Sequence, residues 1–251
     1  MTQGASGREG GRSLKARVKT ARNRTLSSTL WLARQLNDPY VDRAKREGYR
    51  SRAAYKLIEI DERAHILKPG QKIIDLGAAP GGWSQVAAEK IGAGKTGTPP
   101  NTGKVFAIDL LDMAPMPGVE FRQMDFLDPA APDLLREWLG GTADVVLSDM
   151  AANATGHKKT DQLRIIGLVE LAAEFACEIL GPGGAFLAKV LQGGTDTALL
   201  ARLKRDFAQV KHIKPPASRS GSSELYVLAT GFRGRREWAA PAAQDLTVEA
   251  G

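Results

Sequence analysis

Short strand-like segments alternate with helical segments from residue 72 onward, and this alternation restricts the fold more than any other feature of the chain. Such alternation is typical of a parallel sheet covered by helices. Continuous apolar runs such as Val145-Val146-Leu147 and Ala185-Phe186-Leu187-Ala188 fit strands that are buried on both faces. We therefore predict an α/β fold with a doubly wound sheet and helices on both sides. The expected strands are residues 72–76, 104–109, 119–123, 144–149, 184–190 and 224–230, with a weaker one at 208–213.

Helical spacing or capping residues predict three particular helices. The clearest one has apolar residues at positions i, i+3, i+4 and i+7 through residues 165–179, and the Gly/Pro run at 181–184 ends it. A first helix is expected to begin near Ser28. Another is expected to use Ser51 as its N-cap, and its apolar stripe places Lys56 at the border of the buried face. The stripe consists of Ala53, Leu57, Ile60 and Ala64.

Composition divides the chain into three parts. Residues 1–28 are rich in Gly, Ser, Arg and Lys and lack periodicity, so we expect a basic, disordered arm. Residues 29–232 are expected to form the folded domain, and residues 233–251 a flexible tail. Within the domain, the Gly-, Pro- and Thr-rich residues 92–103 are expected to form a loop. A length of 251 residues suits one such domain with a tail at each end.

Positive charge is concentrated in the N-terminal part. Residues 1–56 contain 14 Lys/Arg and 4 Asp/Glu, so residues 57–251 contribute −3 to the net charge of +7. A cationic arm beside a near-neutral domain suits a polyanion such as nucleic acid. An anionic membrane surface would also attract it, and a solvated tail is the simplest alternative.

Several classes of protein are disfavoured by what the sequence lacks. Its one cysteine, Cys177, gives no disulfide framework, and no apolar run approaches the length of a membrane span. The basic N-terminus is not followed by the apolar stretch of a secretory signal. His65, His157 and His212 are scattered without ligand spacing, so we expect no metal site. We expect a cytoplasmic protein without a membrane partner.

The segment from Asp75 to Trp83 runs from a strand into a glycine-rich turn, where open parallel sheets bind ligands. Glycine at such a turn lets the backbone approach a ligand closely. Gly77 and Gly81 are too far apart for the G-x-G-x-x-G fingerprint that cradles a pyrophosphate. The Gly-Lys-Thr at residues 94–96 is not a phosphate loop, because Glu89 stands where that motif requires glycine. A nucleoside cofactor without phosphates fits the turn better.

Acidic residues follow the next two strands. Asp109 ends the second strand and can accept hydrogen bonds from both hydroxyls of an adenosine ribose. Asp125 follows the third strand and can accept a bond from an adenine amino group. The alternative is that such aspartates only cap the helices that follow them. With Asp149 after the fourth strand, three in a row behind a glycine turn favour the cofactor interpretation.

Two lysines and two carboxylates form the candidate reaction site. Asp149 closes the fourth strand, Lys189 lies at the end of the fifth, Glu224 opens the last, and Lys56 lies on the preceding helix. A lysine within an apolar run needs acidic partners or a lowered pKa. A structural ion pair is the simpler interpretation. Together, a nucleoside-cofactor pocket and these four charged residues point to the transfer of a methyl group to a ribose hydroxyl of RNA. In that reaction Lys189 would act as the base or as an electrostatic positioner.

These residues resemble the FtsJ-type family, the heat-shock-associated 2′-O-methyltransferases of bacterial large-subunit ribosomal RNA. The resemblance runs from about Asp38 to Phe232. It is most specific at residues 51–57, 75–85, 148–151 and 223–226. It implies a Rossmann-like, seven-stranded, mostly parallel sheet with an antiparallel last strand. It also implies S-adenosyl-L-methionine as the cofactor, contacted by Gly81, Trp83, Asp109, Asp125 and Asp149.

The resemblance assigns roles and a substrate as well. Lys56, Asp149, Lys189 and Glu224 match the family's catalytic tetrad, and Lys189 matches its proton acceptor. The implied substrate is a uridine of the A-loop in 23S ribosomal RNA, methylated on the large (50S) subunit by a monomeric enzyme. The alternatives are a 2′-O-methyltransferase acting on transfer RNA or another RNA, and a non-catalytic RNA-binding ribosome assembly factor.

Overall fold

The computed structural model describes residues 25–94, 103–152, 156–192 and 197–234. Most of the basic arm, most of the 92–103 loop and nearly all of the C-terminal tail lie outside the described residues, so the expectations for them stay predictions. At the start of the described chain, the side chain of Thr25 accepts a hydrogen bond from the Ser28 backbone and caps the first helix. This helix begins at Leu26, two residues before the predicted start.

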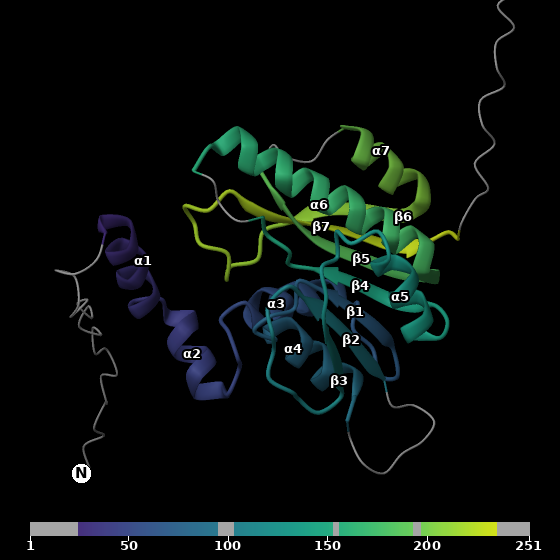
Figure 1. The fold of residues 1–251 in the computed structure, drawn as a ribbon, viewed down its shortest axis with the longest axis horizontal. Coiled ribbons are helices and arrows are strands. Elements are labelled where there is room, and N and C mark those ends of the chain that lie inside the picture. Colours follow the sequence, from purple (N-terminus) through teal and green to yellow (C-terminus); the bar gives the residue numbers. More distant parts are fainter. Residues whose placement is uncertain (1–24, 95–102, 153–155, 193–196, 235–251) are drawn as a thin grey trace, which may run out of the picture.

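Seven strands form one sheet in the order β3-β2-β1-β4-β5-β7-β6 (Figure 1). They are β1 (Lys72–Leu76), β2 (Lys104–Asp109), β3 (Val119–Gln123), β4 (Ala143–Ser148), β5 (Leu180–Leu191), β6 (Phe207–Ile213) and β7 (Glu224–Phe232). Only β7 runs antiparallel to its neighbours, β5 and β6. All seven predicted strands and the predicted orientation of the last one are confirmed.

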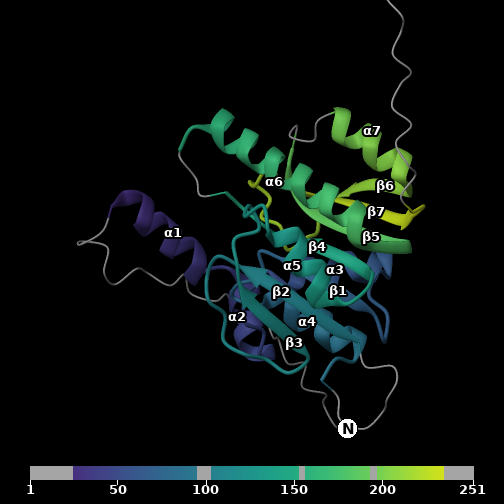
Figure 2. The same cartoon turned by 45° about the vertical axis from the view of Figure 1, so that its right-hand side comes forward.

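Helices cover both faces of the sheet, as the continuous apolar strands predict (Figures 1 and 2). The helices are α1 (Leu26–Leu36), α2 (Pro39–Glu47), α3 (Ala54–Ala64), α4 (Gly82–Ile91), α5 (Ala131–Leu139), α6 (Lys158–Ile179) and α7 (Thr197–Asp206). One hydrophobic core joins α3 and α4 to one face, and a second joins α5, α6 and α7 to the other. Helices α1 and α2 lie beside these layers.

Alternate strand residues serve the two cores. On β1, Ile73 packs against α3 and α4, whereas Ile74 packs on the opposite side; both are fully buried. Val145 and Val146 of β4 divide in the same way. Each such side chain contributes about 1.5 to 3 kcal/mol when it leaves water. The two cores therefore fix the strand register, because a shift by one residue would exchange the faces.

Two local predictions were wrong, and one helix that lies before the strand-helix alternation, α2, was not predicted. Ser51 does not cap α3 with its side chain. The helix starts at Ala54, after a turn in which the Ala54 N–H donates to the Ser51 carbonyl. The Ser51 backbone, and not its hydroxyl, therefore satisfies this N–H group. Strand β5 begins at Leu180, before the glycine run, because Leu180 already pairs with Ala143 ahead of a register shift. Helix α2 has an N-cap, Asp38, and a proline at its start, a signal that the sequence did contain.

The order of the strands creates a switch point. β1 pairs with β2 on one side and with β4 on the other, and the chain proceeds outward from both. Loops from β1 and β4 therefore diverge at their carboxyl ends and leave a crevice between them. The antiparallel β7 instead presents its first residue at this edge, since Glu224 pairs with Leu191 at the end of β5.

Candidate active site

The glycine-rich turn after β1 adopts conformations that suit glycine. Gly77 and Gly81 have φ angles of +77° and +105°, where an L side chain is strained. A Cβ at Gly77 would lie 2.9 Å from the Cα of Met150, so the turn packs closely on the segment after β4. The peptide bond between Ala79 and Pro80 in this turn is cis. The turn thus brings the ends of β1 and β4 together at the switch point.

A cavity of about 710 Å³ opens beyond the carboxyl ends of β1, β2, β3 and β4. Gly77 and Ala79 of the turn line it, as do the three strand-end carboxylates of Asp109, Asp125 and Asp149. The remaining wall is mostly apolar and includes Ile108, Met124, Phe126, Leu168 and Leu171. An apolar cavity of this size with a few converging polar groups has the character of a small-molecule site.

Asp109 and Asp125 are oriented by backbone groups. Asp109 accepts hydrogen bonds from the N–H of Ala79 at 2.9 Å and from the N–H of Leu111 at 2.8 Å, so it also fixes the glycine turn. Asp125 accepts one from the N–H of Leu127 at 2.9 Å. Helix α5, the next helix after Asp125, is preceded by Ala130. The alternative that these aspartates serve as helix caps therefore does not hold, and both line the cavity.

The other two predicted cofactor contacts lie behind the cavity wall. Gly81 has a φ angle of +105°, which favours glycine, and an added Cβ would also meet the side-chain ends of Met113 and Met116. Trp83 is 2% exposed; its indole N–H donates to the Ala53 carbonyl at 2.9 Å, and its ring packs at 5.5 Å from that of Tyr226. Among the residues that line the cavity neither Gly81 nor Trp83 appears. Their role as direct contacts stays a prediction.

The four residues of the predicted reaction site converge at one edge of the sheet. Lys56 comes from the first turn of α3, Asp149 follows β4, Lys189 lies near the end of β5, and Glu224 starts β7. The Lys56 and Lys189 side chains are only 11% and 10% exposed. Residues separated by up to 168 positions thus share one small region, with Asp149 also lining the cavity.

Contacts join the four residues into a chain in which positive and negative charges alternate. Lys56 Nζ lies 2.9 Å from Glu224 Oε2 and 3.8 Å from Asp149 Oδ2. Lys189 Nζ lies 3.1 Å from Asp149 Oδ1 and also donates to the Asp149 carbonyl at 2.5 Å. Each buried ammonium therefore has an acidic partner, as its burial requires. Lys189 stands at one end of the chain and Glu224 at the other.

Two further residues hold this chain in position, and the sequence reasoning missed both. The hydroxyl of Tyr226 donates to Asp149 Oδ1 at 2.9 Å, and the hydroxyl of Ser218 donates to Glu224 Oε1 at 2.7 Å. The strand alternation could have indicated Tyr226, because it lies two residues after Glu224 on the same side of β7. Ser218 lies in a loop without periodicity, so the sequence gives no signal for it.

The electrostatics of the site keep Asp149 ionised. Burial would raise the pKa of Asp149, but the ammonium groups of Lys189 and Lys56 and the hydrogen bonds from Lys189 and Tyr226 outweigh it, so the pKa lies below its ordinary value. Burial and the charges of Asp149 and Glu224 raise the pKa of Tyr226 well above its usual range. Tyr226 therefore stays a neutral hydrogen-bond donor to a permanent carboxylate at neutral pH.

A family model described as FtsJ-like methyltransferase matches residues 49–232, which include the whole sheet and all four residues of the chain of charges. The chain belongs to the FtsJ-like methyltransferase family. The FtsJ-like fold also appears in a crystal structure described as a ribosomal RNA methyltransferase from Plasmodium falciparum. That structure is 32% identical, with a TM-score of 0.64, over 74% of this chain and 100% of the other.

Close sequence relatives within the FtsJ-like family carry one name, ribosomal RNA large subunit methyltransferase E. The protein from Xanthobacter autotrophicus is 68% identical over 90% of this chain and 87% of its own length. The one from Azorhizobium caulinodans is 65% identical over 95% of this chain and 96% of its own length. The resemblance seen in the sequence motifs is confirmed.

Neither membrane spans nor metal clusters were found in the part of the chain that the structure describes. No helix there is long and apolar enough to cross a membrane. No group of three or more His, Cys, Asp or Glu residues there is arranged to hold a metal ion.

Proposed function

We propose that this protein transfers the methyl group of S-adenosyl-L-methionine to a ribose 2′-hydroxyl in 23S ribosomal RNA, at a uridine of the A-loop. We propose that it acts as a monomer on the large (50S) subunit in the cytoplasm. The observation that carries the proposal is the chain of four charged residues beside the cavity. The names of the close relatives support a substrate in the large ribosomal subunit.

The cavity residues fit S-adenosyl-L-methionine. Asp109 would accept the ribose hydroxyls, Asp125 the adenine amino group, and Phe126 and Leu168 would cover the faces of the base. The cavity presents three carboxylates, which suit a cofactor that carries positive charge and no phosphate. When bound, the cofactor supplies an electrophilic methyl group.

The charged chain provides what a ribose hydroxyl needs to become a nucleophile. Lys189, at the end of the chain next to Asp149, would first release its own ammonium proton to solvent and would then accept the hydroxyl proton as the oxygen attacks. Asp149 fixes the direction of the Lys189 amine through its side chain and its carbonyl. Lys56, held by Glu224, would stabilise the negative charge that develops on the oxygen. Holding the hydroxyl in line with the methyl group would lower the barrier further.

Mapping of ribose methylation tests the proposal directly. Ribosomal and transfer RNA from cells with and without the protein would be compared nucleotide by nucleotide. We expect one ribose methylation, on a uridine of the 23S A-loop, to disappear with the protein and to return when the purified protein and S-adenosyl-L-methionine are added to unmethylated large subunits. A methylation lost from transfer RNA instead would identify the alternative substrate. Unchanged methylation in every RNA would leave only an assembly factor.

Substitution of Lys189 separates a base from an electrostatic positioner. We expect Lys189→Ala to lower methyl transfer by at least about 100-fold, since a positioned base contributes 10²–10⁴-fold. Lys189→Arg keeps the positive charge but cannot take up a proton at neutral pH, so it should stay inactive. Binding of S-adenosyl-L-methionine, measured by calorimetry, should persist in both variants. Restored transfer in Lys189→Arg would show that the charge alone suffices.

A further inference from the structure

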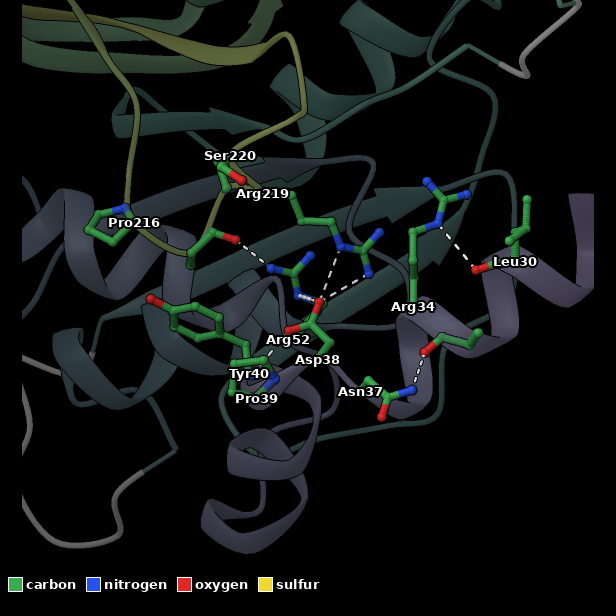
Figure 3. A pocket seen from close by; sticks show the side chains of 13 residues that line it. Leu30, Arg34, Asn37, Asp38, Pro39, Tyr40, Arg52, Pro216, Arg219 and Ser220 are labelled. Carbon is green, nitrogen blue, oxygen red and sulfur yellow. Dashed lines mark hydrogen bonds and ion pairs between the residues drawn. The ribbon is translucent and has the colours of Figure 1, made fainter. Parts of the chain in front are cut away.

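A second cavity, of about 870 Å³, lies between α1, the start of α2 and the loop that joins β6 to β7. We call it the α1 cavity. Its walls include Leu30, Arg34, Asp38, Tyr40, Pro216 and Arg219 (Figure 3). It adjoins the reaction site, because Ser218 belongs to its lining and donates a hydrogen bond to Glu224. A ligand in the α1 cavity would therefore sit beside the residues that face the target ribose.

The charges around the α1 cavity favour an anion. Asp38 is 7% exposed, and its Oδ2 lies 3.0 Å from Arg219 Nη2 and 3.2 Å from Arg52 Nε (Figure 3). Arg34 donates to the backbone carbonyl of Leu30, which does not neutralise its charge. Among the residues that line the cavity, one carboxylate thus stands against three guanidinium groups, and Glu59, which is bonded to Tyr40 and Ala217 of the lining, adds a second negative charge behind the wall. Guanidinium groups that are held in place by a buried carboxylate are well suited to bind phosphate.

The same cavity offers surfaces for a nucleobase. The Tyr40 ring is half-buried, lies 5.7 Å from the Arg52 guanidinium, and is oriented by a hydrogen bond from its hydroxyl to Glu59 at 2.8 Å. Leu30 is 53% exposed on the α1 side, and Pro216 is exposed on the loop side. Unstacked RNA bases bind such aromatic and apolar surfaces while guanidinium groups hold the backbone.

We propose, on the basis of the function proposed above, that the α1 cavity binds an RNA nucleotide that neighbours the methylated one. The base packs between Leu30, Tyr40 and Pro216, and the phosphate pairs with Arg34 and Arg219. Two contacts then position the ribose to be methylated: the reaction site binds the ribose itself, and the α1 cavity binds the neighbouring nucleotide. Because the RNA must occupy the reaction site and the α1 cavity at the same time, the α1 cavity selects RNA whose bases are unpaired near the target.

The sequence next to the cavity supports RNA as its occupant. Residues 1–24, which directly precede the α1 cap, contain seven Lys/Arg and one Glu. A polyanion that reaches the cavity would therefore meet further positive charge along the chain. The same positive charge makes the N-terminal segment itself a poor occupant, because the cavity would repel it.

Charge reversal of Arg34 with a matched control tests the proposal. Arg34 and Arg63 are each the basic residue in the last turn of an 11-residue helix, α1 and α3 respectively. Helix α3 ends before β1 begins, so Arg63 lies toward the edge of the sheet opposite to the reaction site. Arg34→Glu and Arg63→Glu thus make the same change of charge in the last turn of a helix, but only Arg34 lines the cavity.

Binding of purified, unmethylated large ribosomal subunits would be measured over a range of salt concentrations. We expect Arg34→Glu to weaken binding about tenfold or more, in line with a lost charged contact. The slope of log K against log salt should become shallower by roughly 0.7 to 0.9. The loss should fall on KM for the subunits and not on KM for S-adenosyl-L-methionine. Arg63→Glu should match the wild type in all three measurements.

A second variant and a cross-link make the test specific for the cavity. Arg219→Gln keeps Asp38 paired with Arg52 and should weaken binding in the same way, while an unchanged melting temperature confirms the fold. Ultraviolet cross-linking of the wild type to the subunits should join RNA to Tyr40. If Arg34→Glu and Arg219→Gln bind the subunits as well as Arg63→Glu does, while the wild type still methylates RNA, the nucleotide site is excluded and the proposed function stands. If the wild type methylates no RNA, the proposed function itself has failed.

Discussion

Asp75 is a buried carboxyl group at the base of the glycine turn. It is fully buried, and Ser84 Oγ donates to its Oδ2 at 2.6 Å, whereas Oδ1 has no hydrogen-bond partner. Burial raises the pKa of Asp75 to about 7, the charges of Asp149 and Asp109 add to this, and the Ser84 hydrogen bond opposes it. A carboxyl group of this kind ties the stability of the fold to pH.

The direction of that dependence follows from where the proton is held. Between about pH 4 and pH 7 the folded protein keeps a proton on Asp75 that the unfolded chain has lost, so stability falls as pH rises through this window, by roughly 4 kcal/mol in total. Asp75→Asn cannot titrate and should flatten this fall. Urea unfolding from pH 4 to pH 8 measures it, with the exposed Asp42→Asn as control. Parallel curves for Asp75→Asn and the wild type would refute the assignment.

Some residues of the site could be predicted from the sequence and others could not. The four charged residues could be predicted because each lies at a strand end or on a helix whose position the pattern fixes. Ser218 could not, because its contact with Glu224 depends on the path of the loop from Lys214 to Ser223. Trp83 is a different case: its place in a matching motif implies a ligand contact, which stays a prediction, and the structure adds the neighbours Ala53 and Tyr226, which the motif did not indicate.

At the scale of elements, alternation and apolar content were enough to predict all seven strands. Errors arose where a local signal competed with tertiary pairing. The glycine run at 181–184 is typical of a break, yet the pairing of Leu180 with Ala143 carries β5 through it. Ser51 is a good cap by type, but a backbone turn satisfies the first N–H groups of α3. Sequence patterns contain no information on such competition.

The close contact between the β1 turn and the segment after β4 leads to a prediction on stability. Gly77 and Gly92 have similar φ angles of +77° and +74°, but an added Cβ meets Met150 at Gly77 and nothing at Gly92. Gly92→Ala should cost about 1 to 2 kcal/mol from backbone strain alone. Gly77→Ala should cost a further 1 to 3 kcal/mol or so, because the backbone of Met150 leaves no room for the extra methyl group. If denaturant unfolding shows that Gly77→Ala and Gly92→Ala lower the free energy of unfolding equally, Met150 moves aside freely.

At the scale of the whole molecule, charge is distributed unevenly. Residues 1–24 carry a net +6, whereas the C-terminal residues 235–251 carry a net −1, from two Arg against three Asp/Glu. A polycation attached to the domain raises affinity for RNA by releasing bound counterions. The N-terminal segment is therefore expected to add affinity without adding specificity for a base.

Deletion of residues 1–24 tests this role and leaves the Thr25 cap of α1 intact. We expect weaker binding to large ribosomal subunits and a salt dependence that is shallower by roughly 0.7 to 0.9 per lost phosphate contact. Deletion of residues 235–251, a segment of similar size and opposite charge, is the control. An identical salt slope in the wild type and the N-terminal deletion would show that the segment makes no phosphate contacts.

The place of β7 in the sheet affects when the protein can work during its synthesis. This strand is the last in the sequence but lies between β5 and β6, and it brings Glu224 and Tyr226. A nascent chain that has emerged only as far as β6 already contains every residue named in the cavity of about 710 Å³, yet it lacks part of the charged chain. Residues 224–232 must therefore be translated before the growing polypeptide contains the complete charged chain on which the proposed RNA methylation depends.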